Sequence, residues 1–499
     1  MTLQTLTQGL SFRALGPFDG KAEIRNVAYN SKNAGDGVIF VCLVGASRDG
    51  HDFAADVYEM GTRIFVTERA LPLPEDATQL VVSDTRQALA LLSAAFFDHP
   101  EKKLRVIGVT GTKGKSTICE MIRHILTKNG IAAGSIGTVG IRMGDVIRPT
   151  GNTTPESYEL FKIFDEMVKS GMGYAVMEVS SQGIKMDRIF GISFFAAVMT
   201  NLSEDHIGIH EHPDFDDYKQ TKMKLFERAE HCVFNADDRY FTEFLPHAAD
   251  KTTTYGIEAE ADITASQILP TVKGGTFGTS FLPEIHGKPR AEVYLPAPGS
   301  FSVSNALAAL SVCHLIGIPL EKAGSALADV MVRGRFEIVQ TPLSPVFVID
   351  YAHNGESLTA ALMALRAYGP KRLICLFGSV GGRTQIRRHE LGIAAARYAD
   401  FSILTSDNPD DEPPMDILAD IEKHMADAPR VIIPDRKEAI EYAVRTATSG
   451  DIVLFAGKGH ESYQLIEGKK LPFSEKDIIT KSAARLAASP KEVQTTILS

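Results

Sequence analysis

A glycine-rich segment of the chain carries the residue types that bind phosphate groups: Gly111-Thr112-Lys113-Gly114-Lys115-Ser116-Thr117. Glycines let backbone N–H groups face an anion, and the lysine adds a full positive charge. The strict phosphate-loop pattern has another glycine where this chain has Val109, so the match is G-x-x-G-K-S. The pattern favours nucleotide phosphate binding over an ordinary glycine-rich turn with a solvated lysine.

A strand and a helix must flank this loop if it is to bind phosphate. Leu104–Val109 is an apolar run of the length of one buried strand. Apolar residues then recur at helical spacing from Ile118 to Leu126, and Gly130 provides a stop. The helix N-terminus would add partial positive charge to the site.

Polar groups follow two further apolar strands. Glu178 ends the predicted strand Tyr174–Glu178, and an acid at such a position downstream of a phosphate loop commonly holds Mg²⁺. Phe194–Met199 leads into Thr200–His206, which places carboxylate and imidazole groups at a strand's C-terminal edge. Open α/β sheets bind ligands at this edge, so we expect a metal or phosphate contact; a histidine that caps the loop is the alternative.

Two other segments leave alternatives open. Gly151–Pro155 is a hydroxyl-rich turn ahead of a predicted helix at Ser157–Lys169, and is either a helix start or a binding turn. A helix predicted at Tyr218–Ala229 carries three lysines, which by default form a solvated basic face: Lys219, Lys222 and Lys224.

The length of 499 residues predicts two to four domains. Residues 1–102 have the pattern of a small α/β unit, and 103–337 form the segment with the phosphate loop. Residues 338–499 alternate strands and helices as in a parallel, Rossmann-like sheet. Polar groups end four strands of this last segment: Asp350–His353, Gly381–Arg383, Asp407–Asp410 and Gly457–Glu461.

Bulk properties narrow the class of protein. The net charge of −10 argues against a general nucleic-acid binder. No apolar run spans a bilayer and the N-terminus lacks a signal-peptide pattern, so we expect a cytoplasmic protein without membrane insertion. The five scattered cysteines are expected to be reduced thiols: Cys42, Cys119, Cys232, Cys313 and Cys375.

Eight motifs together resemble the Mur ligases, the ATP-dependent amide-forming enzymes of peptidoglycan precursor synthesis. They occur in family order and spacing: GVTGTKGKST, GNTTPES, MEVSSQG, TNLSEDH, SNALAAL, RGRFE, DYAHN and GKGHE. The chain is most similar to the ligases that add a diamino acid to UDP-N-acetylmuramoyl-L-alanyl-D-glutamate. The resemblance implies an α/β fold of three domains: an N-terminal α/β UDP-binding domain (1–102), a central ATPase with a mainly parallel sheet (103–337), and a C-terminal Rossmann-like domain (338–499) that moves to close the site.

The resemblance also implies roles for individual residues. ATP and its phosphates would contact Gly111, Thr112, Lys113, Gly114, Lys115, Ser116, Thr117, Asn305, Arg335, Asp350 and His353. The catalytic residues would be Lys115, Glu178, His206 and Lys222, with Ser116 and Glu178 on one Mg²⁺ and His206 on a second. Lys222 matches the lysine that this family carbamylates to N6-carboxylysine, an anion that helps to hold Mg²⁺.

Two more groups follow from the same resemblance. The UDP-linked precursor would be bound by Ser31, by Ser47 in the Gly45–His51 loop, and by Thr153, Thr154, Ser180, Gln182 and Arg188, with Gln182 departing from the histidine often seen there. The amino acid would be bound by Arg383, Asp407, Asn408, Asp410, Gly457 and Glu461.

The implied reaction has two steps. The side-chain carboxylate of D-glutamate attacks the γ-phosphate of ATP to give an acyl phosphate, and the incoming amine then attacks the acyl carbon. Ligases that take meso-diaminopimelate usually carry D-N-P-R, but this chain has Asp410 in the fourth position. A carboxylate there would attract a distal ammonium, so we expect L-lysine, with L-ornithine or meso-diaminopimelate as alternatives.

Two rival functions remain. A folylpolyglutamate synthetase-like ligase would share the ATPase core, but residues 1–102 match the UDP-binding domain instead. A non-catalytic nucleotide-binding protein is disfavoured by the intact Lys115, Glu178, His206 and Lys222. We expect a monomer whose partners are UDP-MurNAc-L-Ala-D-Glu and a free diamino acid, with ATP and Mg²⁺ as cofactors.

Overall fold

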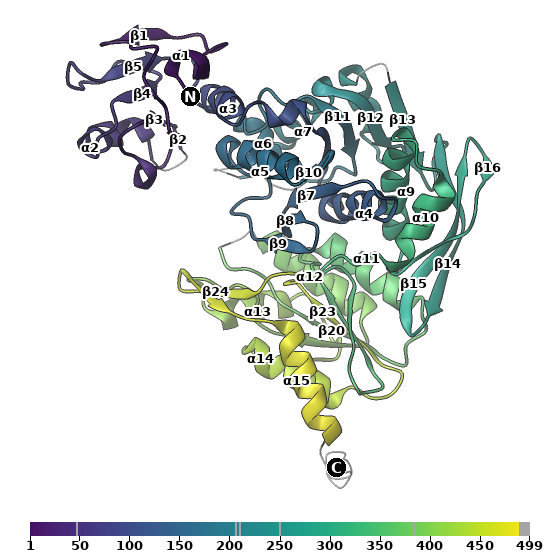
Figure 1. Ribbon diagram of the computed structural model, residues 1–499. Helices are drawn as coiled ribbons and strands as arrows, with labels where there is room; N and C mark the ends of the chain where they lie inside the picture. The colour runs from purple at the N-terminus through teal and green to yellow at the C-terminus, as the bar shows by residue number, and fades with distance from the viewer. Residues whose placement is uncertain (46–47, 205–206, 209–210, 249–250, 383–384, 489–499) are drawn as a thin grey trace. The chain divides into compact units, whose positions relative to one another are not determined.

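The computed structural model describes residues 1–45, 48–204, 207–208, 211–248, 251–382 and 385–488 (Figure 1). The chain forms two compact units. The first comprises Met1–Thr264, Glu284–Arg290 and Asn305–Ala326, and the second comprises Ala265–Pro283, Ala291–Ser304 and Leu327–Ser499.

The first unit begins with a small five-stranded sheet in the order β1-β5-β4-β3-β2, in which β1 alone is antiparallel to its neighbour. Alternate strand residues face opposite sides: Ile39 and Val41 pack with α1 and α3, whereas Phe40 packs with α2. The elements are β1 (Arg13–Leu15), β2 (Asn26–Ala28), β3 (Val38–Val41), β4 (Ile64–Thr67), β5 (Thr78–Val81), α1 (Leu3–Leu6), α2 (Ala54–Glu59) and α3 (Thr85–Phe96).

A larger, mainly parallel sheet follows in the same unit, in the order β13-β12-β11-β6-β10-β7, with β8 and β9 as an antiparallel hairpin at the β7 edge. Its elements are β6 (Arg105–Thr110), α4 (Lys115–Lys128), β7 (Ala133–Gly137), β8 (Gly140–Met143), β9 (Val146–Arg148), α5 (Ser157–Lys169), β10 (Tyr174–Glu178), α6 (Ser181–Lys185), β11 (Phe194–Met199), α7 (Phe215–Met223), β12 (Ala229–Asn235), α8 (Phe241–Phe244) and β13 (Lys251–Gly256).

The register of this sheet positions the phosphate loop. Strand β6 lies between β10 and β11, and Val109 pairs with Glu178 on one side and Val198 on the other. The loop therefore leaves the sheet where both neighbouring strands end, which is the ligand-binding edge of an open α/β sheet.

The larger sheet continues beyond β13 in the order β14-β15-β16, and β17 pairs with β15. These strands are β14 (Ile263–Lys273), β15 (Thr276–Ile285), β16 (Lys288–Pro289) and β17 (Val293–Leu295), and the helices α9 (Ser300–Leu315) and α10 (Leu320–Ala326) follow. Short 3-10 helices occur at η1 (Ser31–Asn33), η2 (Gly50–Phe53), η3 (Pro100–Lys102), η4 (Phe226–Arg228), η5 (Leu245–His247) and η6 (Leu327–Asp329).

The second unit is built on a six-stranded sheet in the order β18-β19-β23-β20-β21-β22, parallel except for β18. Val348 faces a core with α11, α12 and α13, whereas Phe347 faces a core with α14 and α15, so helices cover both faces. The elements are β18 (Glu337–Val339), β19 (Val346–Asp350), α11 (Gly355–Arg366), β20 (Leu373–Phe377), α12 (Gln385–Tyr398), β21 (Phe401–Leu404), α13 (Pro414–Glu422), β22 (Arg430–Ile432), α14 (Arg436–Thr446), β23 (Ile452–Ala456), the hairpin β24 (Tyr463–Ile466) and β25 (Lys469–Pro472), and α15 (Glu475–Ala488).

The mixed α/β class with mainly parallel sheets is confirmed. One helix prediction is wrong in its bounds: the helix expected at Tyr218–Ala229 is α7, Phe215–Met223. Asp214 caps it by accepting a hydrogen bond from Asp217 N, so it starts earlier than the apolar pattern alone indicates.

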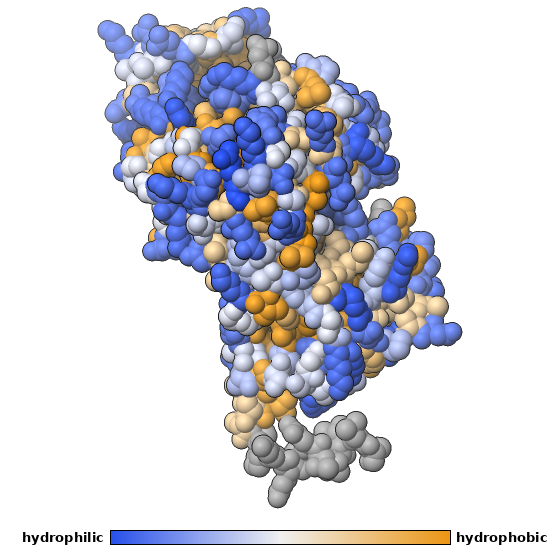
Figure 2. Space-filling model, turned by 90° about the vertical axis from the view of Figure 1, so that its right-hand side faces the viewer, coloured by the Kyte–Doolittle hydropathy of each residue, from blue (hydrophilic) through white to orange (hydrophobic). Residues whose placement is uncertain are grey.

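On the face drawn in Figure 2, hydrophilic and hydrophobic residues are interspersed. Within the described ranges, no helix combines the length and the apolar character needed to cross a bilayer.

Candidate active site

The phosphate loop depends on two glycines with backbone conformations that other residues rarely adopt. Gly111 has φ +139°, and a Cβ there would overlap the Thr200 hydroxyl. Gly114 has φ +86° and is the N-cap of α4; a Cβ there would overlap Asn305 Oδ1. The fold thus brings Asn305 to the loop, in agreement with the proximity that its expected nucleotide contact requires.

The segment after β11 holds the loop from the other side. The Thr200 hydroxyl donates to Lys113 O at 2.6 Å, and Asn201 Oδ1 accepts from Lys113 N at 3.0 Å. Thr112 N donates to Asn201 O at 2.8 Å. Sequence reasoning placed Thr200–His206 near metal or phosphate but missed this supporting role of Thr200 and Asn201, which depends on contacts across the sheet.

Lys115 is the first residue of α4, and its ammonium folds back over the loop. Its Nζ donates to Gly111 O and Thr112 O, both at 2.9 Å. Ser116 and Thr117 follow in the first helical turn, where backbone N–H groups and the helix dipole favour an anion. All seven residues predicted for the loop, 111–117, are therefore gathered at one helix N-terminus.

Glu178 lies buried at the end of β10 and is bound by three donors. Its Oε1 accepts from the Ser116 hydroxyl at 2.7 Å and from Thr138 N at 2.8 Å, and its Oε2 accepts from the Thr138 hydroxyl at 3.3 Å. A Cβ at Gly137 would overlap Glu178 Oε1, so the carboxylate needs this small neighbour. Thr138, at the end of β7, was missed; its position after a buried strand is the signal that indicates it.

The donor set around Glu178 fits a hard divalent cation. Mg²⁺ prefers oxygen ligands and is commonly bound by one or two protein groups together with phosphate oxygens and water. Ser116 and Glu178 supply a hydroxyl and a carboxylate at the phosphate loop. Among the described residues no three His, Cys, Asp or Glu side chains gather to form a self-contained metal site.

Lys222 on α7 is buried, so the interpretation of this position as part of a solvated basic face is wrong. Its Nζ donates to Gly111 O at 3.0 Å and to the Thr110 hydroxyl at 3.3 Å, and lies 4.6 Å from the centre of the Tyr218 ring. The structure therefore brings Lys222 to the phosphate loop. His206, its expected neighbour as a metal ligand, lies outside the described residues.

The turn at 151–155 gathers most residues expected to bind the muramoyl peptide. The hydroxyls of Thr153 and Thr138 lie 3.0 Å apart, and those of Thr154 and Ser180 lie 3.1 Å apart. Arg188 Nη1 donates to Thr154 O at 3.1 Å. Gln182 lies in α6, which Ser180 caps, so these residues share one region of the first unit.

Glu156 links this turn to the small N-terminal sheet and was not predicted. Its carboxylate lies 3.4 Å from both Arg188 and Arg86. Arg86 also donates to Val44 O at 2.8 Å, at the start of the loop expected to bind uridine diphosphate. Ser31 opens the short helix η1 of the same sheet region, whereas Ser47 lies outside the described residues.

Three residues expected to contact the nucleotide belong to the second unit. Both oxygens of buried Asp350 accept backbone N–H groups, from Phe336 and Ala352, and burial raises the pKa of this carboxyl. Arg335 lies over the Tyr351 ring, 4.7 Å from its centre. His353 Nδ1 lies 2.8 Å from Tyr351 O. Their contacts with a nucleotide stay predictions.

Next to this group, His460 packs against Tyr351 with ring centres 5.0 Å apart. Burial, reinforced by the positive charges of Arg335 and Arg333, lowers the pKa of His460 to about 4. The imidazole is therefore neutral near pH 7.

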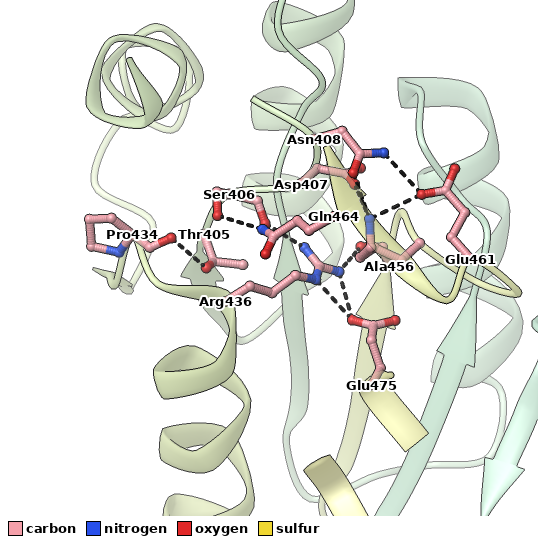
Figure 3. A network of polar contacts seen from close by, with 11 residues as sticks. Thr405, Ser406, Asp407, Asn408, Pro434, Arg436, Ala456, Glu461, Gln464 and Glu475 are labelled. Carbon is pink, nitrogen blue, oxygen red and sulfur yellow. Dashed lines mark hydrogen bonds and ion pairs between the residues drawn. The ribbon is translucent and has the colours of Figure 1, made fainter. Parts of the chain in front are cut away.

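Three of the residues expected to bind the amino acid, Asp407, Asn408 and Glu461, lie together after the ends of β21 and β23 (Figure 3). Asn408 Nδ2 donates to Glu461 Oε2 at 2.9 Å, and a Cβ at Gly457 would lie 2.8 Å from Asp407 Oδ2. Lys458, which was not predicted, contacts this whole group. Arg383 lies outside the described residues.

Asp410 is turned toward the β24–β25 hairpin. Its Oδ1 accepts from Gly468 N at 2.8 Å, and its backbone pairs with Leu465 and Glu467. Asp410 has φ +52°, a conformation that Asp tolerates better than most residues. A structural role thus accounts for an acid at this position, which weakens the expectation that it selects a distal ammonium.

Three family profiles match the chain: "Mur ligase family, catalytic domain" at residues 23–97, "Mur ligase middle domain" at 109–313 and "Mur ligase, glutamate ligase domain" at 334–459. Two curated relatives are both named UDP-N-acetylmuramoyl-L-alanyl-D-glutamate--2,6-diaminopimelate ligase. The protein from Clostridium perfringens is 36% identical and covers 96% of this chain and 99% of its own length; that from Caldanaerobacter subterraneus is 39% identical and covers 96% and 98%.

Solved structures of related ligases have a similar fold. A structure titled as a UDP-N-acetylmuramoyl-L-alanyl-D-glutamate--2,6-diaminopimelate ligase has a TM-score of 0.71 at 26% identity and covers 98% of this chain and 100% of its own. A folylpolyglutamate synthase from Mycobacterium tuberculosis, complexed with ADP and AMPPCP, has a TM-score of 0.63 at 17% identity, covers 81% of this chain and 94% of its own, and shares the fold alone. With matches over nearly its whole length and an assembled phosphate loop, the chain belongs to the Mur ligase family of ATP-dependent amide-forming ligases.

Proposed function

We propose that this protein joins a diamino acid to the D-glutamate side-chain carboxylate of UDP-MurNAc-L-Ala-D-Glu, in peptidoglycan precursor synthesis. The observation that carries the proposal is the cluster of Lys115, Ser116 and buried Glu178 beside the Thr153–Thr154 turn. The cluster places side chains that can bind the phosphates of ATP next to hydroxyl groups that can bind an acceptor substrate. The names of the curated relatives support the same reaction.

In this proposal the residues act by position and charge. Loop amides and Lys115 bind the β- and γ-phosphates and offset the repulsion between the triphosphate and the attacking carboxylate. Thr154, Ser180 and Arg188 hold the muramoyl peptide so that its carboxylate approaches the γ-phosphate in line. An acyl phosphate and ADP form, the amine attacks the acyl carbon, and phosphate leaves.

Ser116 and Glu178 would hold Mg²⁺ at this site, and when bound it would neutralise charge on the phosphates. We also propose that Lys222 is carbamylated, because a buried lysine beside the loop would then contribute an anion at the place where a cation is needed. Native mass spectrometry of the intact protein at neutral pH tests this: the protein should carry the extra mass of one CO₂ that Lys222→Met lacks, and removal of dissolved CO₂ should lower activity. An unmodified, fully active protein would reject it.

The diamino acid is proposed to be meso-diaminopimelate. The names of the curated relatives favour it over L-lysine, and Asp410, the basis of the L-lysine expectation, has a structural partner in Gly468. L-lysine is the second candidate, because the fourth residue of D-N-P-D still lacks the arginine typical of diaminopimelate ligases. L-ornithine ranks behind both.

A competition experiment tests the proposal. The protein is incubated with ATP, Mg²⁺, UDP-MurNAc-L-Ala-D-Glu and an equimolar mixture of meso-diaminopimelate, L-lysine and L-ornithine. The molecular masses of the products are then measured by mass spectrometry. The diaminopimelate adduct should dominate; a lysine adduct would overturn the choice of amino acid, and ADP release independent of the precursor would overturn the ligase function. The domain boundaries at 102/103 and 337/338, the cytoplasmic location and the monomeric state stay predictions.

A further inference from the structure

Lys458 is a fully buried lysine at the end of β23, just after Gly457. Its Nζ lies 2.9 Å from Asn408 Oδ1, 3.0 Å from Glu461 Oε2 and 3.4 Å from Asp407 Oδ1. An ammonium has three donors, and here each has an acceptor. A buried charge is tolerated only when it is paired in this way.

The acceptors of Lys458 are the residues expected to bind the amino acid. Glu461 Oε2 accepts hydrogen bonds from Lys458 Nζ and from Asn408 Nδ2 (Figure 3). These two bonds orient the carboxylate. Within the described part of the chain, both contacts of this carboxylate use Oε2, which leaves Oε1 to accept from a ligand. The side chain of Glu461 keeps 15% of its surface exposed, whereas those of Lys458 and Asp407 are 0% and 4% exposed.

The charges of this network add up to one negative charge. Arg436 binds Glu475 through Nε and Nη2, both 2.9 Å from Oε1, which forms a separate neutral pair. Asp407 and Glu461 then share the single positive charge of Lys458. Together, Lys458, Asp407 and Glu461 are therefore complementary to one ammonium group.

We propose that Lys458 is a positioning residue that makes this site specific for an amino acid holding one ammonium at Glu461. This rests on the proposed function. A diamino acid must present one neutral amine to the acyl phosphate, and the single net negative charge of Lys458, Asp407 and Glu461 matches the one ammonium that remains. Lys458 acts through Glu461 and Asn408, whose orientation it sets.

Lys458→Met and Glu461→Gln, alone and combined, test the inference. Each single variant should raise the KM for the diamino acid by at least about tenfold, with little change in the KM for ATP or for the precursor. Because Lys458 acts through Glu461, the double variant should have a KM no higher than that of the worse single variant. Lys476→Met is the matched control: its ammonium pairs with Glu337 on the surface and should not affect the KM for the diamino acid.

The first half-reaction separates this inference from the proposed function. ADP formed in a single turnover without amino acid should be the same in Lys458→Met and in the parent protein. If the parent itself forms no precursor-dependent ADP, the proposed function fails. If it does, and Lys458→Met leaves the KM for the diamino acid unchanged, the inference fails.

The Lys458→Met variant leaves the buried carboxylate of Asp407 and the partly buried carboxylate of Glu461 without their cation, which can prevent folding. The double variant loses one charge of each sign and keeps the net charge, so it provides the second test. Its KM for the diamino acid should equal that of Glu461→Gln. A further severalfold increase would show that Lys458 acts independently of Glu461 and would overturn the inference.

Discussion

Replacement of Glu178 by Gln isolates the charge of the candidate metal ligand from its hydrogen bonds. The amide oxygen of Gln can keep the bonds from the Ser116 hydroxyl and Thr138 N, and the Thr138 hydroxyl can rotate to accept from the amide nitrogen. The free energy of unfolding should therefore change by only about 1 kcal/mol. The lost charge acts where phosphate charge develops, so kcat should fall by about 10²–10³-fold, or about 3–4 kcal/mol.

Initial rates of ADP release at saturating substrates, measured across a range of Mg²⁺ concentrations, give kcat and the half-saturating Mg²⁺ concentration. The variant should need more Mg²⁺ as well as turning over more slowly, because one anionic ligand has been removed. Glu230→Gln, an exposed acid of the same unit, should match the parent protein. A kcat within about threefold of the parent with the same Mg²⁺ dependence would refute the assignment of Glu178 as a metal ligand.

Three further changes have definite expected outcomes. Gly111→Ala should weaken ATP binding at least about tenfold in calorimetry, because the new Cβ meets the Thr200 hydroxyl and φ +139° is a conformation that L-residues rarely adopt; an unchanged Kd would contradict this. Asp410→Ala should lower the free energy of unfolding by about 1–2 kcal/mol, whereas Asp410→Asn, which keeps an acceptor for Gly468 N, should lower it less; equal losses would argue against the hairpin contact. The pKa of His460 is about 4 in the folded protein and about 6.5 in the unfolded chain. The stability that the neutral imidazole contributes is therefore complete above pH 6.5, and about 2–3 kcal/mol of it is lost as the pH falls toward 4. His460→Gln should flatten this part of the stability–pH curve, and an unchanged slope would count against a buried neutral imidazole.

The features predicted best from the sequence are those encoded in one contiguous stretch. The strand, glycine loop and helix around Lys115 follow from apolar spacing and the glycine pattern, and β6 and α4 lie there as expected. The position of Glu178 at the end of a buried strand was predicted for a similar reason, since a single strand and its last residue carry the signal.

What the sequence could not reveal depends on contacts between distant residues. Lys222 lies on α7 together with Lys219, and Lys224 follows the helix; only the fold distinguishes the buried Lys222, which reaches Gly111 O, from these neighbours. Asp410 was interpreted as a substrate-selecting acid because Gly468, its partner, lies 58 residues further along the chain. Lys458 in the GKGHE motif gave no sign of its burial, since a lysine between two glycines usually belongs to a solvated loop.

The hairpin β24–β25 has a consequence for measuring substrate binding. Leu465 N donates to Asn408 Oδ1. Asp410 accepts hydrogen bonds from Glu467 N and Gly468 N, which lie in the turn that connects the two strands of the hairpin. The loop with Asn408 and the hairpin are thus tied together by several hydrogen bonds, and a displacement of one must carry the other. A fluorescent label on the exposed strand at Lys470 would therefore report occupancy of the proposed amino-acid site from a surface position, without any dye at the site itself.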